Sequence, residues 1–243
     1  MRIMTFNIQH SLDYKNQVVD PALFADAIRL YGADVCGLNE VRRGDGAHKA
    51  YTDQARDIGE ALGFYHYFAK ANYFVGDEIY AYDYGNALVS RYPIKEAVTI
   101  PIPNTEDRSE PTYYETRCAI KAVLDVDGTD ICFLVCHMGL AKSERREAVA
   151  VLCRLLDEIT MPVVLMGDFN DVPTSPVLKP LFERLQDAGD LGEEASLSTF
   201  RSYDPHEKID YIFYRGLACT KSTVITQVMS DHFPIIADMS LYD

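Results

Sequence analysis

Short apolar runs alternate along this chain with segments of helical spacing and with turns. The runs are short enough to be strands, and one of them, residues 161–166, is apolar throughout, as expected of a strand buried on both faces. Asp127-Gly128 is a strong hairpin signal between two runs. The predicted strands are residues 2–8, 35–39, 87–90, 94–100, 117–126, 129–136, 161–166, 209–214, 223–228 and 235–239.

Helix signals fall between these strands. Asp20 is a favoured N-cap residue, Pro21 suits the first helical position, and Gly32 and Gly63 mark helix ends. The predicted helices are residues 21–30, 48–62, 142–159 and 175–185.

Two segments fit neither pattern. Residues 64–84 contain six tyrosines in a hairpin-like arrangement, which predicts either sheet surface or the lining of a pocket. Residues 101–115, with three prolines and several acidic residues, predict a loop. Substrate specificity is expected to depend on such loops.

The order of elements predicts an α/β fold. Each half of the chain combines strands, hairpins and helices, and no linker separates the halves. We therefore expect one domain over residues 1–243, with two sheets packed face to face between layers of helices.

Composition places the chain among ordinary globular proteins, with 48% hydrophobic residues and no apolar stretch of membrane-spanning length. The N-terminus has no basic and apolar leader, and the six cysteines form no CxxC pair, which favours buried free thiols in a reducing compartment. A cytoplasmic monomer is expected.

The net charge of −14, from 37 acidic and 23 basic residues, disfavours binding of long duplex nucleic acid. Proteins that bind long duplexes usually present a basic stripe to the phosphates. The only adjacent arginines are the pairs Arg42-Arg43 and Arg145-Arg146. Acidic side chains gathered in one place would instead suit a divalent cation.

The sequence Gly167-Asp168-Phe169-Asn170 ends the most apolar run. In an extended chain the side chains of Asp168 and Asn170 share a face, so both can address one site at a strand end. A plain turn is the alternative, because glycine, aspartate and asparagine are common turn residues. Other predicted strands also end in polar groups: Asn7, Glu40, His137, Asp210 and the triplet Ser230-Asp231-His232. Seven such positions, with Asp168 and Asn170 counted separately, favour a site over chance turns.

In this order the segments resemble the signature blocks of the endonuclease/exonuclease/phosphatase superfamily, the deoxyribonuclease I-like metal-dependent phosphoesterases. The matching blocks are Thr-Phe-Asn-Ile, Leu-Asn-Glu-Val, Gly-Asn-Ala-Leu-Val-Ser-Arg-Tyr-Pro, Gly-Asp-Phe-Asn, Ile-Asp-Tyr-Ile and Ser-Asp-His, and they extend from Asn7 to His232. Each block alone is weak, and the ordered set is strong. The resemblance implies a four-layer sandwich of two mainly antiparallel or mixed sheets flanked by helices.

The resemblance also implies a metal side and a water side of the site. Glu40, Asn7 and Asp231 would hold Mg²⁺, with Mn²⁺ as a substitute, through the oxygen ligands that hard cations prefer. Asp168 would orient or deprotonate the attacking water, and Asn170 would donate to a phosphoryl oxygen.

The remaining implied roles concern the scissile phosphate. His232 would lie beside it, oriented by Asp210 through the other ring nitrogen, and His137 would donate to the phosphate or protonate the leaving group. Asn86 would contact substrate or belong to a turn at the start of its strand. Arg117 would contact substrate or form an ion pair, with Glu40 as one partner.

The sequence thus predicts a Mg²⁺-dependent hydrolase of a compact phosphoester, either a phosphodiesterase or a phosphatase. An endo- or exonuclease acting on short or damaged nucleic acid is the runner-up. A catalytically inactive binding module with the same fold is the alternative from another class. Substrate identity and the choice between one and two metal ions are left open.

Overall fold

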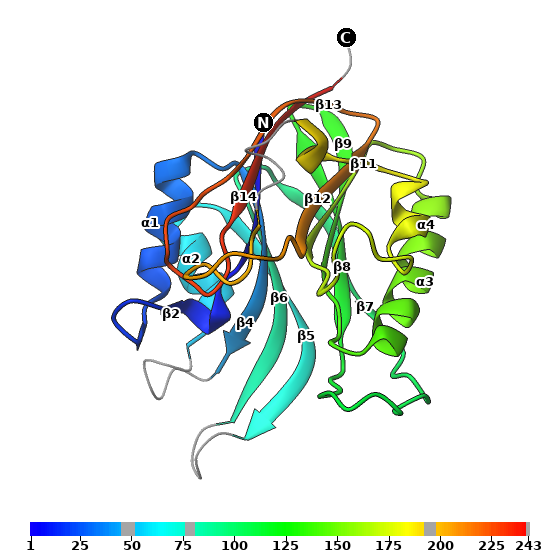
Figure 1. The fold of residues 1–243 in the computed structure, drawn as a ribbon. Helices are drawn as coiled ribbons and strands as arrows, with labels where there is room; N and C mark the ends of the chain where they lie inside the picture. Colours follow the sequence, from blue (N-terminus) through cyan, green and yellow to red (C-terminus); the bar gives the residue numbers. More distant parts are fainter. Residues whose placement is uncertain (45–51, 76–80, 192–197, 242–243) are drawn as a thin grey trace.

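The computed structural model describes residues 1–44, 52–75, 81–191 and 198–241. Two six-stranded sheets pack face to face in this structure (Figure 1). The first sheet has the order β13 (Ala218–Val224), β14 (Ile235–Ser240), β1 (Arg2–Asn7), β4 (Val35–Arg43), β6 (Ala81–Ser90) and β5 (Tyr65–Val75). The second has the order β11 (Gln186–Asp187), β12 (Asp210–Arg215), β10 (Val163–Asp168), β9 (Thr129–His137), β8 (Cys118–Val126) and β7 (Ile94–Pro101). A two-stranded pair, β2 (Leu12–Asp13) and β3 (Val18–Val19), lies outside both.

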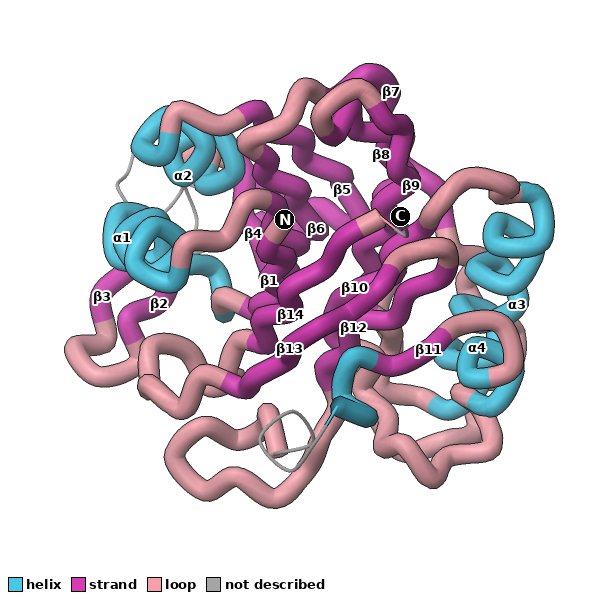
Figure 2. The backbone as a smooth tube through the Cα atoms, turned by 90° about the horizontal axis from the view of Figure 1, so that it is seen from above, coloured by secondary structure: helices cyan, strands magenta, loops and turns pink. Residues whose placement is uncertain are grey.

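Helices cover the outer face of each sheet, which gives four layers (Figure 2). The helices α1 (Pro21–Tyr31) and α2 (Gln54–Leu62) lie against the first sheet, and α3 (Lys142–Glu158) and α4 (Lys179–Phe182) lie against the second. Short 3₁₀ turns occur at Gln9–Ser11 and Ala188–Leu191. The predicted sandwich of two sheets between helix layers is confirmed.

The sequence signals for helix ends act as expected. The side chain of Asp20 accepts a hydrogen bond from the backbone of Ala22, and Gly32 ends α1 with a left-handed φ of 67°. Gly63 ends α2 in the same way, with φ 71°. An asparagine or aspartate cap and a left-handed glycine supply partners for the unpaired groups at helix ends.

Three apolar cores hold the layers together. One lies between the sheets, one between the first sheet and α1 and α2, and one between the second sheet and α3 and α4. Alternate residues of each central strand therefore enter different cores. In β10, Val164 and Met166 pack between the sheets, while Val163 and Leu165 pack toward the helices. The whole strand is buried, as its apolar run predicts.

Several predicted bounds differ from the structure. The helix predicted at residues 48–62 begins at Gln54, capped by Asp53, and residues 48–51 lie outside the described residues. Only Lys179–Phe182 is α-helical within the predicted segment 175–185. The strand predicted at residues 223–228 is β13, which spans Ala218–Val224; its polar residues are tolerated because it is an edge strand with an exposed side.

The tyrosine-rich segment forms the predicted hairpin, with β5 paired antiparallel to β6. These two strands extend beyond the rest of the first sheet (Figure 1). All six cysteines are free thiols, four of them buried, as their positions in apolar patterns predict. In the described ranges, no helix is long and apolar enough to span a bilayer.

Candidate active site between the sheet ends

Three neighbouring strands of the second sheet place His137, Asp168 and Asp210 in one row. Asp168 of β10 is in register with His137 of the parallel strand β9 and with Asp210 of the antiparallel strand β12. Each of the three lies two residues from an apolar side chain of its own strand that packs in the core between the sheets. These apolar residues are Val135, Met166 and Ile212. Because side chains alternate along a strand, these three point into the gap between the sheets where that core ends.

The first sheet contributes Asn7 and Asn39 to the same gap. They are in register across the parallel strands β1 and β4, and both are fully buried. The amide nitrogen of Asn7 lies 3.0 Å from Asp168 Oδ2 and 3.1 Å from Glu40 Oε1. Asn7 therefore links the two sheets through a hydrogen bond from one central strand to the other.

A β-bulge brings Glu40 into this group. The pairing of β4 with β6 is interrupted between Leu38 and Val41, and Glu40 has a left-handed φ of 59°. Regular alternation would point Glu40 toward the helices, on the side opposite Asn39. A bulge re-aims the side chain and is typical of strand segments beside active sites.

The position of Gly167 before Asp168 predicts a turn. The structure requires glycine there for a different reason. Gly167 remains within β10, paired with Cys136 and Tyr211, and a Cβ atom there would lie 1.8 Å from the backbone oxygen of Cys136. Its φ of 142° is also one that other residues rarely adopt. Glycine thus permits the close approach of β9 and β10 that aligns Asp168 with His137.

The chain turns at Asn170, two residues after Asp168. Asn170 has a left-handed φ of 49°, and its backbone nitrogen donates to Asp168 Oδ1 over 2.8 Å. The prediction that Asp168 and Asn170 share a face of an extended segment is therefore wrong, since an aspartate turn brings them together instead. The side-chain nitrogen of Asn170 donates to the backbone oxygen of Met138 at 2.9 Å, which leaves its second N–H for a ligand.

His232 completes a buried chain of ionisable groups. Its Nδ1 lies 2.9 Å from Asp210 Oδ2, and its Nε2 lies 3.7 Å from Asp168 Oδ2. Burial lowers the pKa of His232, but the charges of Asp210 and Asp168 outweigh this and raise it to about 10. Burial raises the pKa of Asp168 to about 7. His232 is therefore held as an imidazolium between carboxylates.

His137 is held in the opposite state by Arg117. The guanidinium nitrogen Nη1 of Arg117 lies 2.8 Å from Nδ1 of His137. A guanidinium only donates hydrogen bonds, so Nδ1 accepts and the ring proton resides on Nε2. That Nε2 lies 3.4 Å from Asp168 Oδ2. Burial and the charge of Arg117 hold the pKa of His137 well below its usual range, so this ring is a neutral N–H donor.

Two predicted substrate contacts are used within the protein. Arg117 pairs with Glu115 at 2.8 Å, with both side chains 8% exposed, rather than with Glu40. Asn86 lies inside β6, not at its start, and its amide accepts from Asn39 and donates to the backbone of Cys118. This geometry favours a structural role for Asn86.

The sequence did not single out Asn39, Glu115 or Tyr84, which lie around the site. Asn39 donates to Asn86, and its Oδ1 accepts from the backbone nitrogen of Asp168 at 2.9 Å. Tyr84 interacts with Glu40, and burial with this interaction raises its pKa well above the usual range. Only Asn39 had a signal, since it stands beside Glu40 in the Leu-Asn-Glu-Val block.

Glu40 and Asp231 lie close enough for their charges to interact, and both offer carboxylate oxygens. Burial raises the pKa of Asp231, and the charge of Glu40 adds to the rise, so the two carboxylates repel each other without a cation between them. Asn7 as placed is a hydrogen-bond donor to Glu40 and Asp168, and its oxygen accepts from the backbone of Gln9. Its amide would have to turn over to serve as the predicted oxygen ligand.

Asp168, Asp210 and His232 form a second group with metal-ligand spacing, their nearest ligand atoms lying within 4.8 Å of one another. Asp210 Oδ1 is buried there without a hydrogen-bond partner. The hydrogen bond between Asp210 and His232 already occupies the Nδ1 atom of the ring. Magnesium prefers oxygen ligands, and Glu40 and Asp231 offer these without a ring nitrogen.

Comparison with known proteins gives a consistent result. The sequence profile of the Endonuclease/Exonuclease/phosphatase family matches residues 4–232. The comparison with curated proteins gave no match.

Solved structures share the fold over nearly the whole chain. An endonuclease/exonuclease/phosphatase from Beutenbergia cavernae is 25% identical with a TM-score of 0.83, over 99% of this chain and 71% of that one. A family protein from Leptotrichia buccalis is 23% identical with a TM-score of 0.77, over 99% and 100%. A mannosyl-6-phosphatase from Bacteroides thetaiotaomicron is 19% identical with a TM-score of 0.76, over 99% and 100%.

Proposed function

The chain belongs to the endonuclease/exonuclease/phosphatase family, and we propose that it hydrolyses a compact phosphoester with the help of Mg²⁺. The proposal rests on the buried chain Asp210–His232–Asp168, together with Asp231, on which the charges of both His232 and Glu40 act. Ionisable groups with strongly shifted pKa values gather at sites of acid–base chemistry.

Glu40 and Asp231 would hold the cation, with Asn7 as a further ligand in its turned orientation. The cation would neutralise the non-bridging oxygens of the phosphate. Mn²⁺ would substitute, since it accepts the same oxygen ligands.

Asp168 would accept the proton of the attacking water. Its pKa of about 7 is close to a neutral working pH, which is where a general base is most effective. The hydrogen bond from the backbone of Asn170 fixes the orientation of its carboxylate.

The two histidines would act in different charge states. His232, protonated and oriented by Asp210, would place a positive charge beside the phosphoryl group. His137 would donate its Nε2 proton in a hydrogen bond to a phosphoryl oxygen without transferring it, because Arg117 keeps the ring neutral. The sequence allowed two roles for His137, a hydrogen bond to the phosphate or protonation of the leaving group. We propose the first. The second N–H of Asn170 would donate to the same phosphate.

A compact substrate is favoured by the charges around the site. Arg117 is paired with Glu115, and Arg43 and Lys70 are both paired with Asp83. These paired cations are less available to bind the phosphates of a long nucleic acid strand. A sugar phosphate, the kind of substrate named for the Bacteroides relative, is the size class we propose.

Hydrolysis of p-nitrophenyl phosphate and bis-p-nitrophenyl phosphate, each with Mg²⁺ and with EDTA, tests the proposal. We expect Mg²⁺-dependent release from one of them, and the preferred ester separates phosphatase from phosphodiesterase. Release that is insensitive to EDTA, or no release with Mg²⁺ or Mn²⁺, would contradict it.

Two further assays test the other candidates. Nicking of supercoiled plasmid at rates above those for small esters would favour the nuclease. Absence of turnover on small esters and nucleic acid alike would favour an inactive binding module.

A further inference from the structure

A continuous strip of aromatic and arginine side chains leads from His232 to the surface. The ring of Phe200 lies 4.7 Å from the ring of His232, and the guanidinium of Arg201 lies 5.5 Å from the centre of Phe200. Arg201 donates to the hydroxyl of Tyr203 at 3.1 Å. Tyr203 in turn stacks on Tyr14, with centroids 5.5 Å apart and planes within 5°. We refer to Phe200, Arg201, Tyr203 and Tyr14 as the aromatic strip.

The strip is anchored to the segment that carries His232. The backbone of Ser202 donates to the backbone of Asp231 at 2.7 Å, and its hydroxyl donates to the backbone oxygen of Ser230. The backbone of Tyr14 donates to Met229 at 2.9 Å. Both loops of the strip are therefore fixed relative to the proposed catalytic histidine.

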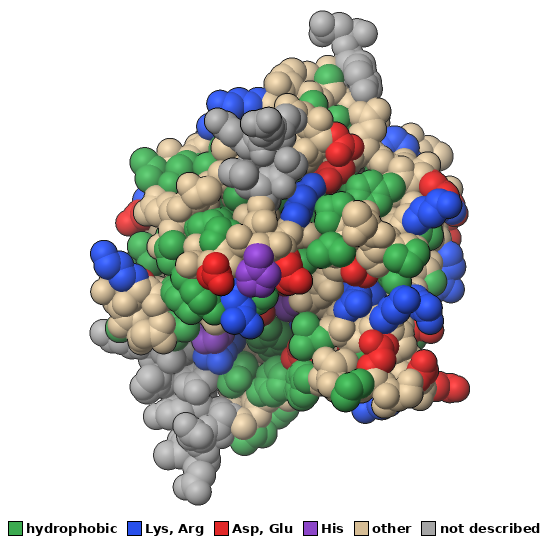
Figure 3. Space-filling view, viewed as in Figure 1, with side chains coloured by type: hydrophobic (Ala, Val, Ile, Leu, Met, Phe, Trp, Pro, Cys, Tyr) green, Lys and Arg blue, Asp and Glu red, His purple; other side chains and the backbone are tan. Residues whose placement is uncertain are grey.

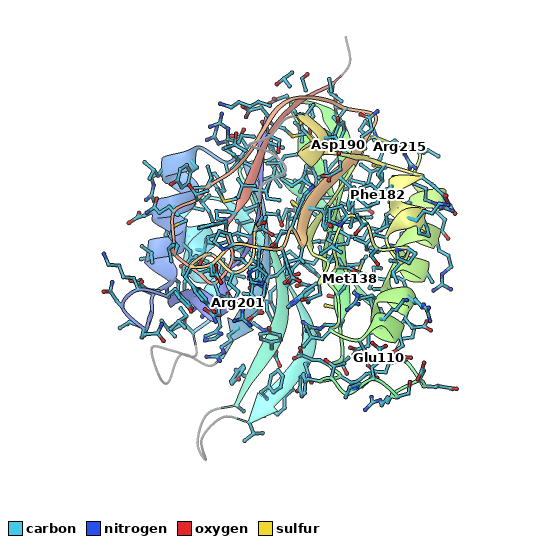
Figure 4. All side chains as sticks on the ribbon, viewed as in Figure 1. Glu110, Met138, Phe182, Asp190, Arg201 and Arg215 are labelled. Atoms are coloured by element: carbon cyan, nitrogen blue, oxygen red, sulfur yellow. The ribbon has the colours of Figure 1, made fainter. Side chains whose placement is uncertain are left out.

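The strip is also open to ligands. Tyr203 is 52% exposed and Arg201 is exposed, while Phe200 and Tyr14 are half-buried. Figure 4 shows Arg201 at the end of the sheets where Met138 follows β9. On this face, histidine side chains lie beside acidic and basic ones around a hollow (Figure 3). The strip thus runs from a ring beside His232 to the exposed side chains of Arg201 and Tyr203.

Loop packing alone accounts for the stacking of Tyr14 on Tyr203. It does not account for an exposed arginine that joins this pair to a ring in contact with His232. Flat tyrosine faces stack on sugar or base rings, and guanidinium and phenol groups donate hydrogen bonds to ring hydroxyls or carbonyls.

We propose that the aromatic strip binds the ring of the alcohol that is esterified to the phosphate, so that the substrates are phosphoesters of a sugar or nucleoside rather than of an acyclic alcohol. This inference rests on the proposed function, because it takes the phosphate to lie at His232. The ring would stack on Tyr203, and Arg201 would donate to its polar groups.

Two matched variants test the strip. Tyr203→Ala removes the stacking face, and Tyr65→Ala removes a tyrosine that is also 52% exposed but lies at the opposite end of the first sheet, in register with Ser90. Initial rates are measured with mannose 6-phosphate, adenosine 5′-monophosphate and acyclic glycerol 3-phosphate. We expect Tyr203→Ala to lower kcat/KM for one of the ring esters about ten-fold, through KM, in line with the loss of one stacking contact.

The controls define the outcome. Glycerol 3-phosphate hydrolysis in Tyr203→Ala, and all rates in Tyr65→Ala, should stay within about two-fold of wild type. Tyr203→Phe should retain most ring-ester activity, because it keeps the stacking face. An equal loss on ring and acyclic esters, or no loss on either ring ester, would overturn the inference.

Saturation-transfer NMR separates this inference from the proposed function. With Mg²⁺ present, ring protons of mannose 6-phosphate or adenosine 5′-monophosphate should receive saturation from wild type and much less from Tyr203→Ala. Ring binding of this kind without hydrolysis of any ester would refute the proposed function but would support ring binding by the aromatic strip. Absence of ring saturation in wild type would overturn the inference that the aromatic strip binds the ring, whatever the hydrolysis rates are.

Discussion

Asn39 takes no part in the proposed chemistry, yet it joins three of the strands that carry the site. Its amide donates to Asn86 of β6 and to the backbone of Cys136 in β9, and its oxygen accepts from Asp168 of β10. Asn39→Ala would leave these buried groups without partners. We expect the free energy of unfolding to fall by about 3 kcal/mol, since each unsatisfied buried group costs about 1–3 kcal/mol.

Urea unfolding measures this loss. Asn104→Ala, in an exposed loop position, is the control and should change stability by less than about 0.5 kcal/mol. A similarly small change for Asn39→Ala would contradict the role assigned to Asn39.

The pH dependence of the metal-free protein tests the charge state of His232. A histidine whose pKa rises from 6.5 to about 10 on folding contributes stability below pH 6.5, and this contribution is lost as pH rises toward 10. Stability to urea should therefore fall between pH 7 and 9. His232→Gln should flatten that decline, and an equally steep decline in this variant would show that other groups cause it.

Residue types at the site could be predicted from sequence better than their partners could. The strand-end positions of Asp168, Asp210 and His137 follow from alternation within apolar runs. The pairing of Arg117 with His137 does not, because it depends on how the loop after β7 returns to β8. The left-handed φ of Glu40 had no local sequence signal, whereas that of Asn170 fits the turn that asparagine favours.

At the scale of elements, β10 depends on one glycine. A side chain at Gly167 would collide with the backbone of Cys136, and a backbone atom cannot move aside without breaking the pairing of β9 with β10. Gly167→Ala should therefore destabilise the protein by more than about 4 kcal/mol or abolish soluble expression.

Gly63→Ala is the matched control, because Gly63 has a left-handed φ of 71° but no atom within 4 Å of an added Cβ. It should cost only about 1 kcal/mol, the strain of a left-handed alanine. Equal effects of the two substitutions in thermal unfolding would show that backbone strain, and not the collision, makes Gly167 necessary.

Central strands and long helices were predictable, while edges were not. The alternating or fully apolar runs of β9 and β10 can pair in only one register within a sandwich, because any other register exposes apolar side chains. The edge strand β13 buries less, so its polar sequence carries a weak signal and its predicted bounds are shifted. The helix α4 has only four residues, which is too short for the spacing of apolar residues to predict where it begins and ends.

At the scale of the whole molecule, the site joins the two sheets and should couple metal binding to stability. Glu40 and Asp231 come from the first sheet and the segment before β14, and Asp168 from the second sheet. Mg²⁺ bound at this site would stabilise the folded protein only, so it should raise Tm by a few degrees at millimolar concentration. Glu40→Gln and Asp231→Asn should each reduce this shift.

The exposed Glu60→Gln is the control for the loss of one charge and should leave the Mg²⁺-dependent shift unchanged. A shift that persists in both Glu40→Gln and Asp231→Asn would place the cation elsewhere, with the group of Asp168, Asp210 and His232 as the next position to test.

In the proposed function, hydrolysis takes place at Asp168, in the gap between the sheet ends. The most direct measurement is the initial rate of Mg²⁺-dependent phosphoester hydrolysis by Asp168→Asn, which preserves the size of the side chain and removes the base. With the fold verified by circular dichroism, we expect a fall in kcat of at least about 100-fold, the usual range for loss of a general base being about 10²–10⁴-fold. A folded Asp168→Asn variant with a rate close to that of wild type would contradict it.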